Sequence, residues 1–173
     1  MSLFLVEFAP KGAIETVLES LKSAISLAGA ELIEVQVTAE KNHVFSIIEA
    51  ANAGTVKESL TKAGFEFDGI APVRLVGADL DQVKQSRPPT GYLVEWDIPE
   101  GITMDAYLAR KKEKSPLYAQ VPETTFQRTY VREDMLKCLC FYDAPDEAAV
   151  VRAREVVSTP IDRLHKLDTS LGD

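Results

Sequence analysis

A short string of residues occurs twice in this chain, and it constrains the fold more than any other feature. Leu-Val-Glu followed by an aromatic residue stands at residues 5–8 and again at residues 93–96, 88 positions later (93 − 5). A second match, between Ile48–Ala50 and Tyr142–Ala144, is 94 positions apart (142 − 48). Self-similarity at a nearly fixed spacing is typical of an internal repeat. The chain is therefore predicted to hold two copies of one unit, the second longer by six residues (94 − 88).

The first copy has the hydrophobic periodicity of a β-α-β-β-α-β unit. Residues 13–27 carry apolar side chains at helical spacing, whereas Ile33, Val35 and Val37 alternate with polar residues as in a half-buried strand. Gly29 and Gly64 follow the two helical segments, where glycine commonly ends a helix. We expect strands at residues 3–8, 31–40, 43–50 and 70–76, with a turn at 40–42 between the second and third. A helix is expected at residues 13–27, and a second helix, capped by Asn52 or Thr55, continues through Ala63.

The second copy repeats this order. We expect its first strand around residues 93–96, further strands at 124–131, 136–143 and 161–167, and helices at 104–114 and 146–157. The extra residues fall at 115–123, which contain Pro116 and Pro122 and are predicted to form a loop. Between the copies, Arg87-Pro88-Pro89-Thr90 closes a charged segment, because paired prolines neither continue a helix nor join a central strand. The predicted organisation is a first repeat at 1–78, a linker at 79–90, a second repeat at 91–168 and a tail at 169–173.

Each predicted unit has one sheet face that its own helices do not cover. A unit of this size is marginally stable alone, so the two sheets are expected to face one another. The predicted fold class is α+β, with two tandem repeats that form an intrachain, pseudo-dimeric α+β barrel. Such a chain can cover its own sheet faces, so we expect a monomer or a weak homodimer.

Composition excludes several classes of partner. The chain has 19 Lys and Arg against 27 Asp and Glu, a formal charge of −8, so it lacks the positive charge that nucleic-acid binding requires. No signal sequence or apolar stretch of roughly 20 residues is evident, so no membrane partner is expected. The two cysteines, Cys138 and Cys140, are interpreted as free thiols, and together these features favour a cytoplasmic location.

Several motifs of the second copy resemble a known family. They are residues 128–131, 140–146 and 148–153, within a segment that covers most of 91–167. The segment resembles the DUF4242 family of nickel-responsive-protein-like domains, and the resemblance implies a ferredoxin-like fold for both tandem repeats. One member is similar to a nickel binder that uses two histidines, and the corresponding positions here are Asp97 and Arg154. An arginine does not coordinate a metal, so we expect no metal site and no cofactor.

The alternation of side chains along the strands predicts which residues point between the two sheets. In the first copy this inward set includes Val44, Ser46 and Ile48, and in the second it includes Cys138. The remaining inward residues are the candidate ligand-binding residues: Glu7, Glu34, Gln36, Glu95, Arg128, Tyr130, Cys140 and Tyr142. A polar inner face whose members differ between the copies is typical of one asymmetric pocket, although Glu95 and Arg128 could instead form a buried structural ion pair.

Three functions remain open at this stage. The first is a small-molecule-binding protein in which Arg128 and Tyr130 orient the ligand while Glu7 and Glu95 accept hydrogen bonds. The second is an enzyme similar to monooxygenase-like or isomerase-like α+β barrels, with Glu95 or Glu7 as base. In that hypothesis Tyr130 is the acid, and the nucleophile is Cys140 with a pKa that Arg128 lowers. The third is metal binding.

The two histidines have no evident partner in the sequence. We interpret His43, after the hairpin turn, and His165, in the last strand, as surface or packing residues.

Overall fold

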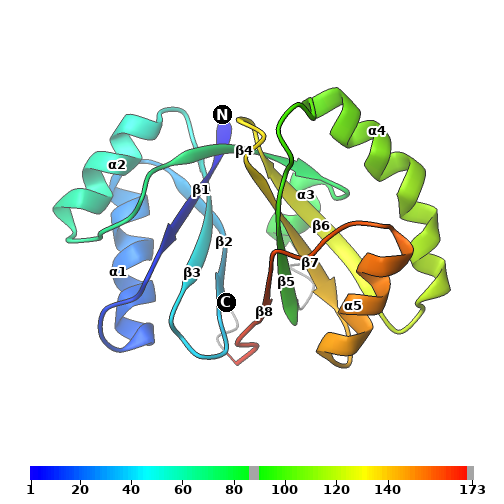
Figure 1. The fold of residues 1–173 in the computed structure, drawn as a ribbon. Coiled ribbons are helices and arrows are strands. Elements are labelled where there is room, and N and C mark those ends of the chain that lie inside the picture. Colours follow the sequence, from blue (N-terminus) through cyan, green and yellow to red (C-terminus); the bar gives the residue numbers. More distant parts are fainter. Residues whose placement is uncertain (86–89, 171–173) are drawn as a thin grey trace.

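The strands of this protein lie between two outer groups of helices (Figure 1). The structure, a computed structural model, describes residues 1–85 and 90–170. It is a mixed α and β fold with an antiparallel sheet, as the periodicity predicted. None of the helices in the described residues combines the length and the apolar character that crossing a bilayer requires.

The first half follows the predicted β-α-β-β-α-β order. Its elements are β1 (Ser2–Phe8), α1 (Ile14–Leu27), β2 (Glu31–Val37), β3 (Val44–Ala50), α2 (Ala53–Lys62) and β4 (Ala71–Val76). The Asn52 side chain caps α2 by accepting a hydrogen bond from the Gly54 backbone N–H. Gly29 and Gly64 have positive φ angles of 69° and 89° directly after the two helices, which explains why glycine stands there.

The second half repeats the order with one addition. Its elements are β5 (Tyr92–Asp97), α4 (Met104–Lys114), the 3₁₀ helix η1 (Ser115–Gln120), β6 (Thr125–Arg132), β7 (Lys137–Asp143), α5 (Glu147–Val156) and β8 (Arg163–Lys166). The prediction of a loop for residues 115–123 is wrong for η1. Pro116 stands at the start of this helix, where its missing N–H costs no hydrogen bond.

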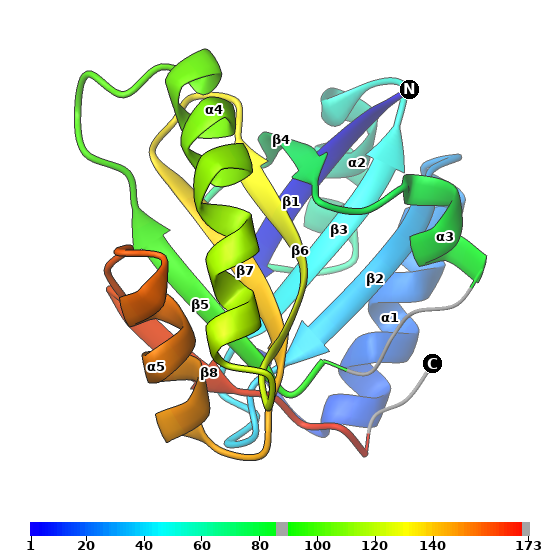
Figure 2. The same cartoon turned by 90° about the vertical axis from the view of Figure 1, so that its right-hand side faces the viewer.

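The segment expected to be a plain linker forms a short helix, α3 (Leu80–Gln85). Its Val83 is buried, and its Lys84 contacts Glu31 and Glu49 at 3.2 and 2.8 Å. Figure 2 shows α3 beside β2. The predicted proline break at residues 87–89 lies outside the described residues.

One eight-stranded sheet contains all the described strands, in the order β2-β3-β1-β4-β6-β7-β5-β8. β4 and β6 pair antiparallel, with Val73 opposite Arg132, and this pairing joins the two halves. A bridge between Thr38 and Leu167 connects the chain just beyond β2 and β8, the two outermost strands. The Asp168 N–H donates to the Val37 carbonyl at 2.8 Å beside this bridge.

Three apolar clusters form the core. One lies between the strands and helices of the first half and one between those of the second half. The third combines residues from both halves, and we call it the central cluster. It contains Leu5, Ile33, Phe45, Ile47, Val73, Val83, Leu93, Tyr130, Leu139, Phe141 and Leu167. The region between the two halves, which was expected to be polar, is therefore largely apolar.

The prediction of which β3 and β7 residues point inward, away from the helices, is wrong. Glu7 pairs with Phe45 and Glu95 pairs with Leu139, so these apolar residues share the inner face with the carboxylates. Six residues expected inside belong to the opposite face, toward the helices: Val44, Ser46, Ile48, Cys138, Cys140 and Tyr142. Both strands are buried on both faces, so nearly all of their residues are apolar. The sequence pattern therefore could not show which residues face inward and which face the helices.

A buried polar group lies within the central region and links the two halves. Arg128 on β6 donates to both carboxylate oxygens of Glu34 on β2, with Nε–Oε2 at 2.9 Å and Nη2–Oε1 at 2.6 Å. Tyr130 donates its hydroxyl hydrogen to Glu34, and Gln36 Nε2 donates to Glu34 Oε1 at 2.9 Å. Arg128 therefore forms its buried ion pair with Glu34 and not with Glu95, the partner considered from the sequence.

We predict that Arg128→Ala lowers the free energy of unfolding by about 3–5 kcal/mol, because it leaves the Glu34 carboxylate buried without a cation. Urea denaturation at neutral pH measures this change. Arg74→Ala is the matched control, since the Arg74–Glu133 pair is exposed and should contribute less than about 1 kcal/mol. A loss in Arg128→Ala no larger than in the control would contradict the structural role of the pair.

Candidate functional site

A cleft of about 650 Å³ opens at the end of the sheet where β1 and β5 finish and β3 and β7 begin. The side chains around it come from strand ends of both halves. Those used below are Glu7, His43, Glu95, Lys137, Arg163 and His165. Because antiparallel neighbours bring the end of one strand to the start of the next, residues far apart in the sequence meet here.

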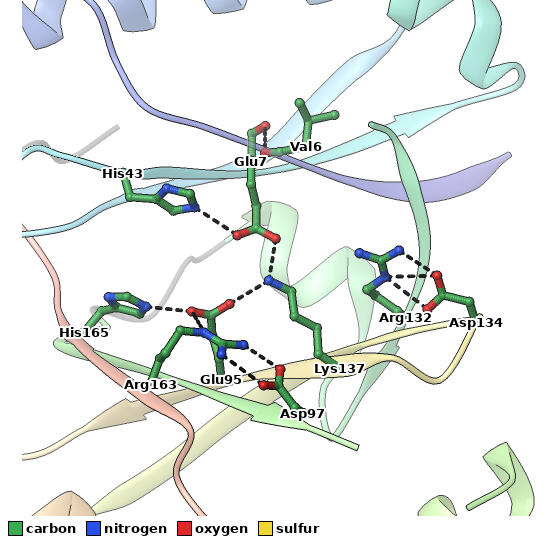
Figure 3. A network of polar contacts seen from close by, with 11 residues as sticks. Val6, Glu7, His43, Glu95, Asp97, Arg132, Asp134, Lys137, Arg163 and His165 are labelled. Carbon is green, nitrogen blue, oxygen red and sulfur yellow. Dashed lines mark hydrogen bonds and ion pairs between the residues drawn. The ribbon is translucent and has the colours of Figure 1, made fainter. Parts of the chain in front are cut away.

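Lys137 connects two carboxylates from different halves (Figure 3). Its Nζ lies 2.7 Å from Glu7 Oε2 and 2.6 Å from Glu95 Oε1. The Glu95 side chain is only 4% exposed, while Glu7 and Lys137 retain 19% and 15%. Two carboxylates this close to each other need a shared cation, and Lys137 supplies it.

Each of these carboxylates also contacts an imidazole. His43 Nε2 lies 2.9 Å from Glu7 Oε1, and His165 Nε2 lies 2.7 Å from Glu95 Oε2. Both imidazole rings pack against the ring of Phe45, with centroid distances of 4.6 Å for His43 and 5.4 Å for His165. The cleft therefore holds two glutamate–histidine pairs, one from each half.

Arg163 completes the network on the side of the second half. Its Nε lies 2.8 Å from Glu95 Oε2, and its two terminal nitrogens contact the two Asp97 oxygens at 3.0 and 2.6 Å. Asp97 thus forms a two-point ion pair with Arg163.

The network keeps its carboxylates ionised. Burial favours the neutral form of Glu95, but hydrogen bonds from His165, Lys137 and Arg163 outweigh it and lower its pKa to about 2. Burial also opposes ionisation of Glu7, and the contacts with His43 and Lys137 lower its pKa as well. For Lys137, burial is outweighed by the two carboxylates, which raise its pKa.

This charge state fixes the hydrogen-bonding roles of the imidazoles. An ionised carboxylate only accepts hydrogen bonds, so Nε2 of His43 and Nε2 of His165 must be the donors. In a neutral imidazole the other nitrogen, Nδ1, then carries the lone pair. Each pair can accept a hydrogen bond, or a proton, at Nδ1.

The eight candidate ligand-binding residues fall into three places. Glu7 and Glu95 line the cleft. Four residues, Glu34, Gln36, Arg128 and Tyr130, form the buried group in the central region, and their role in ligand binding stays a prediction. Cys140 and Tyr142 lie on the helix-facing side of β7. The cation near Cys140 is Arg154, at 3.5 Å, and the suggestion of Arg128 is wrong because Arg128 faces Glu34.

Sequence reasoning missed four residues of the network: His43, Lys137, Arg163 and His165. The interpretation of the two histidines as residues without a partner is wrong, since the carboxylates that they contact are 36 and 70 positions away. The repeat held one usable signal. His43 and Lys137 are 94 positions apart (137 − 43), the spacing of the second sequence match, so they occupy equivalent places beside equivalent glutamates.

We predict that the fold loses stability as the pH falls from about 4.5 to about 2. The pKa of Glu95 is depressed, so its ionised form stabilises the fold above pH 4.5, and this contribution disappears as the pH approaches about 2. The contribution is about 3–4 kcal/mol, from roughly 1.4 kcal/mol per pKa unit. Urea denaturation across this pH range should show a shallower loss in Glu95→Gln.

Glu58→Gln is the control for this experiment, because Glu58 is a solvent-exposed carboxylate on α2 paired with Lys62. It should retain the wild-type pH dependence. Equal slopes for Glu95→Gln and the wild type would show that Glu95 does not carry the effect.

The chain is similar to solved structures over almost its whole length. One is described as "Putative Chlorite dismutase TA0507"; it is 13% identical, with a TM-score of 0.58, and the match covers 97% of this chain and 95% of the other. A second, described as "Putative monooxygenase (FN1347)" from Fusobacterium nucleatum, is 11% identical, with a TM-score of 0.45, covering 96% and 90%. At 13% identity the likeness to the first structure concerns the fold alone, which is ferredoxin-like α+β. No curated protein matches the chain.

The second half also matches a family by sequence. The family model described as "Nickel responsive protein SCO4226-like" matches residues 92–167. Asp97 and Arg154 stand where the sequence resemblance placed the two nickel-binding histidines. Neither is suited to a metal, because Arg163 contacts both Asp97 oxygens and Arg154 is itself a buried cation. In residues 1–85 and 90–170, no group of three or more His, Cys, Asp or Glu could hold a metal ion. The resemblance to nickel-responsive proteins is thus confirmed for residues 92–167 as one of sequence.

Proposed function

We propose that this chain binds a small polar organic molecule in the cleft, with His43 and His165 as the groups that recognise it. The observation that carries the proposal is the arrangement of the two glutamate–histidine pairs, which flank one cleft and share Lys137. The cleft volume of about 650 Å³ lies within the range of small-molecule pockets, roughly 300–1,000 Å³.

The ligand contacts must come from the imidazoles, because the carboxylates are already occupied. Both oxygens of Glu7 and both oxygens of Glu95 contact a cation or an imidazole of the protein. The Nδ1 atoms of His43 and His165 are hydrogen-bond acceptors when the rings are neutral. We therefore infer a ligand that donates hydrogen bonds, such as an alcohol, a phenol or an enol.

The charge around the cleft favours a neutral ligand over an anion. Four glutamates and three cations line it, a balance of −1 when the imidazoles are neutral. The four glutamates are Glu7, Glu40, Glu95 and Glu147, and the three cations are Lys137, Arg163 and Lys166. An anionic ligand would have to approach this excess of negative charge inside a partly buried site.

A thermal-shift screen tests this proposal. We predict that at least one neutral hydroxylated or phenolic compound raises the melting temperature of the wild type at neutral pH, whereas the matched carboxylates do not. At 100 times the dissociation constant the stabilisation is about 2.7 kcal/mol. His43→Asn and His165→Asn should each reduce the shift, because each removes one acceptor at the cleft.

Arg74→Ala serves as the control variant, since Arg74 pairs with Glu133 at an exposed position and does not line the cleft. It should respond to the compound like the wild type. The proposal fails if none of the compounds stabilises the wild type, or if both histidine variants bind as well as the control.

A second candidate function is proton transfer. A carboxylate that holds one nitrogen of an imidazole leaves the other nitrogen as a general base, which is how many enzymes orient a catalytic histidine. Here the pairs Glu7–His43 and Glu95–His165 have this arrangement. Turnover of a bound compound, with a rate that rises as an imidazole loses its proton, would favour this candidate over binding alone.

We further propose that the two halves are tandem ferredoxin-like copies of one DUF4242-like unit that close into a single pseudo-dimeric barrel in a monomeric chain. The proposed units are residues 1–78 and 91–168, joined by 79–90 and followed by the tail 169–173. Support comes from the repeated element order, from the β4–β6 pairing and from the bridge between Thr38 and Leu167, which joins the outermost strands.

Separate expression of residues 1–78 and 91–173 tests this arrangement. Each half would expose its side of the central cluster, so we predict that each is insoluble or self-associated and that mixing restores a 1:1 heterodimer. Light scattering on a size-exclusion column measures these states. Two halves that are each stable and monomeric would contradict the barrel.

A further inference from the structure

A buried arginine in the second half has no carboxylate partner in the described part of the chain. Arg154 on α5 is 3% exposed. Its Nη1 contacts Cys140 Sγ at 3.5 Å and the Tyr142 hydroxyl at 3.2 Å, and its Nη2 donates to the Pro160 carbonyl at 2.6 Å. Its Nε has no hydrogen-bond partner. A buried cation is costly unless negative charge compensates it, so this site calls for an anion.

The sulfur of Cys140 is the atom best placed to supply that charge. Besides Arg154 Nη1, it accepts a hydrogen bond from Thr129 Oγ1 at 3.4 Å, and Cys138 Sγ lies 3.8 Å away. A thiol is a weak acceptor, whereas a thiolate accepts strongly. Three potential donors around one buried sulfur therefore fit a thiolate at Cys140 and a thiol at Cys138.

A small cavity gives access to this sulfur. Its volume is about 30 Å³, which is room for about two water molecules at roughly 10–15 Å³ each. Arg110, Lys111, Lys114 and Arg154 line it together with Cys140, and its lining contains no Asp or Glu. In a chain with a formal charge of −8, this concentration of cations stands out as a local positive site.

We infer that Cys140 is a buried thiolate, paired with Arg154, that reacts with hydrogen peroxide in this cavity. Hydrogen peroxide has two heavy atoms and fits the available volume. The sulfur attacks one peroxide oxygen, an S–O bond forms while the O–O bond breaks, and hydroxide leaves. Cys140 is oxidised to sulfenic acid and the peroxide is reduced. The cations at the cavity stabilise the departing negative charge.

The surroundings of the sulfur agree with this assignment. The hydrogen bond from Cys138 lowers the pKa of Cys140, and the charges of Lys111 and Arg154 act in the same direction against burial. The other titratable groups facing it are the phenols of Tyr107, Tyr118 and Tyr142, and burial raises the pKa of each. These three phenols stay neutral at physiological pH.

Thiolate absorbance at 240 nm, followed from pH 4 to 8.5, tests the first part of the inference on the full chain. The variant Cys138→Ser leaves one cysteine, and we expect its pKa to lie below the ordinary cysteine value of about 8.5. Lys111→Met in this background removes one cation from the cavity without touching the sulfur, and Arg154→Lys weakens the guanidinium contact. Both should shift the titration upward. Cys138→Ser with Cys140→Ser provides the baseline.

Peroxide reactivity tests the second part. Cys138→Ser is treated with hydrogen peroxide for set times and then unfolded in denaturant that contains dimedone, so that the probe reaches the buried sulfur. It should gain the dimedone adduct at Cys140, detected by mass spectrometry, and Lys111→Met should slow labelling several-fold. Lys62→Ala, at an exposed position on α2, should label at the parent rate. A Cys140 titration at or above pH 8.5, or no adduct at Cys140, would overturn the inference. Neither readout involves the cleft, so the result is independent of the proposed function.

Discussion

The packing of the central cluster, which combines apolar residues from both halves of the sheet, is the interaction on which the rest of the structure depends. Leu5, Phe45 and Ile47 come from the first half and Leu139 and Phe141 from the second. In the part of the chain that the structure describes, the glutamate–histidine pairs lie at one end of this apolar cluster, and the group around Glu34 is buried beside it. The helix α3 lies against one end of β2, and the cleft opens at the other.

The buried carboxylates of Glu34 and Glu95 differ in their capacity to take part in ligand binding. Glu34 is 1% exposed and accepts from Arg128, Tyr130 and Gln36, so its contacts join the two halves and leave little capacity for a ligand. Glu95 is nearly as buried but sits at the rim, where its partner His165 is 24% exposed. The rim carboxylate orients a group that solvent or a ligand can reach, which is the usual relation between a supporting residue and a binding residue.

The sequence was informative where local pattern decides structure. The order of elements and the helix ends at Gly29 and Gly64 followed from periodicity and turn chemistry. The sequence did not show which residues of β7 face inward, because a strand covered on both sides has no polar face to distinguish the two. Nor did it show the glutamate–histidine pairs, since the strand pairing that brings their members together is a long-range feature. The cation beside Cys140 was also missed, because Arg154 comes from a helix and not from a neighbouring strand.

The two halves place different residues at the cleft. At equivalent positions the first half has His43, which contacts its own Glu7, and the second has Lys137, which contacts both glutamates. Leu5 of β1 pairs with Ala71, whereas its counterpart Leu93 of β5 pairs with His165. An interface that only had to hold the two halves together could have the same residues on both sides. A site for one asymmetric molecule requires different residues on the two sides, and the divergence of these positions is what such a site would produce.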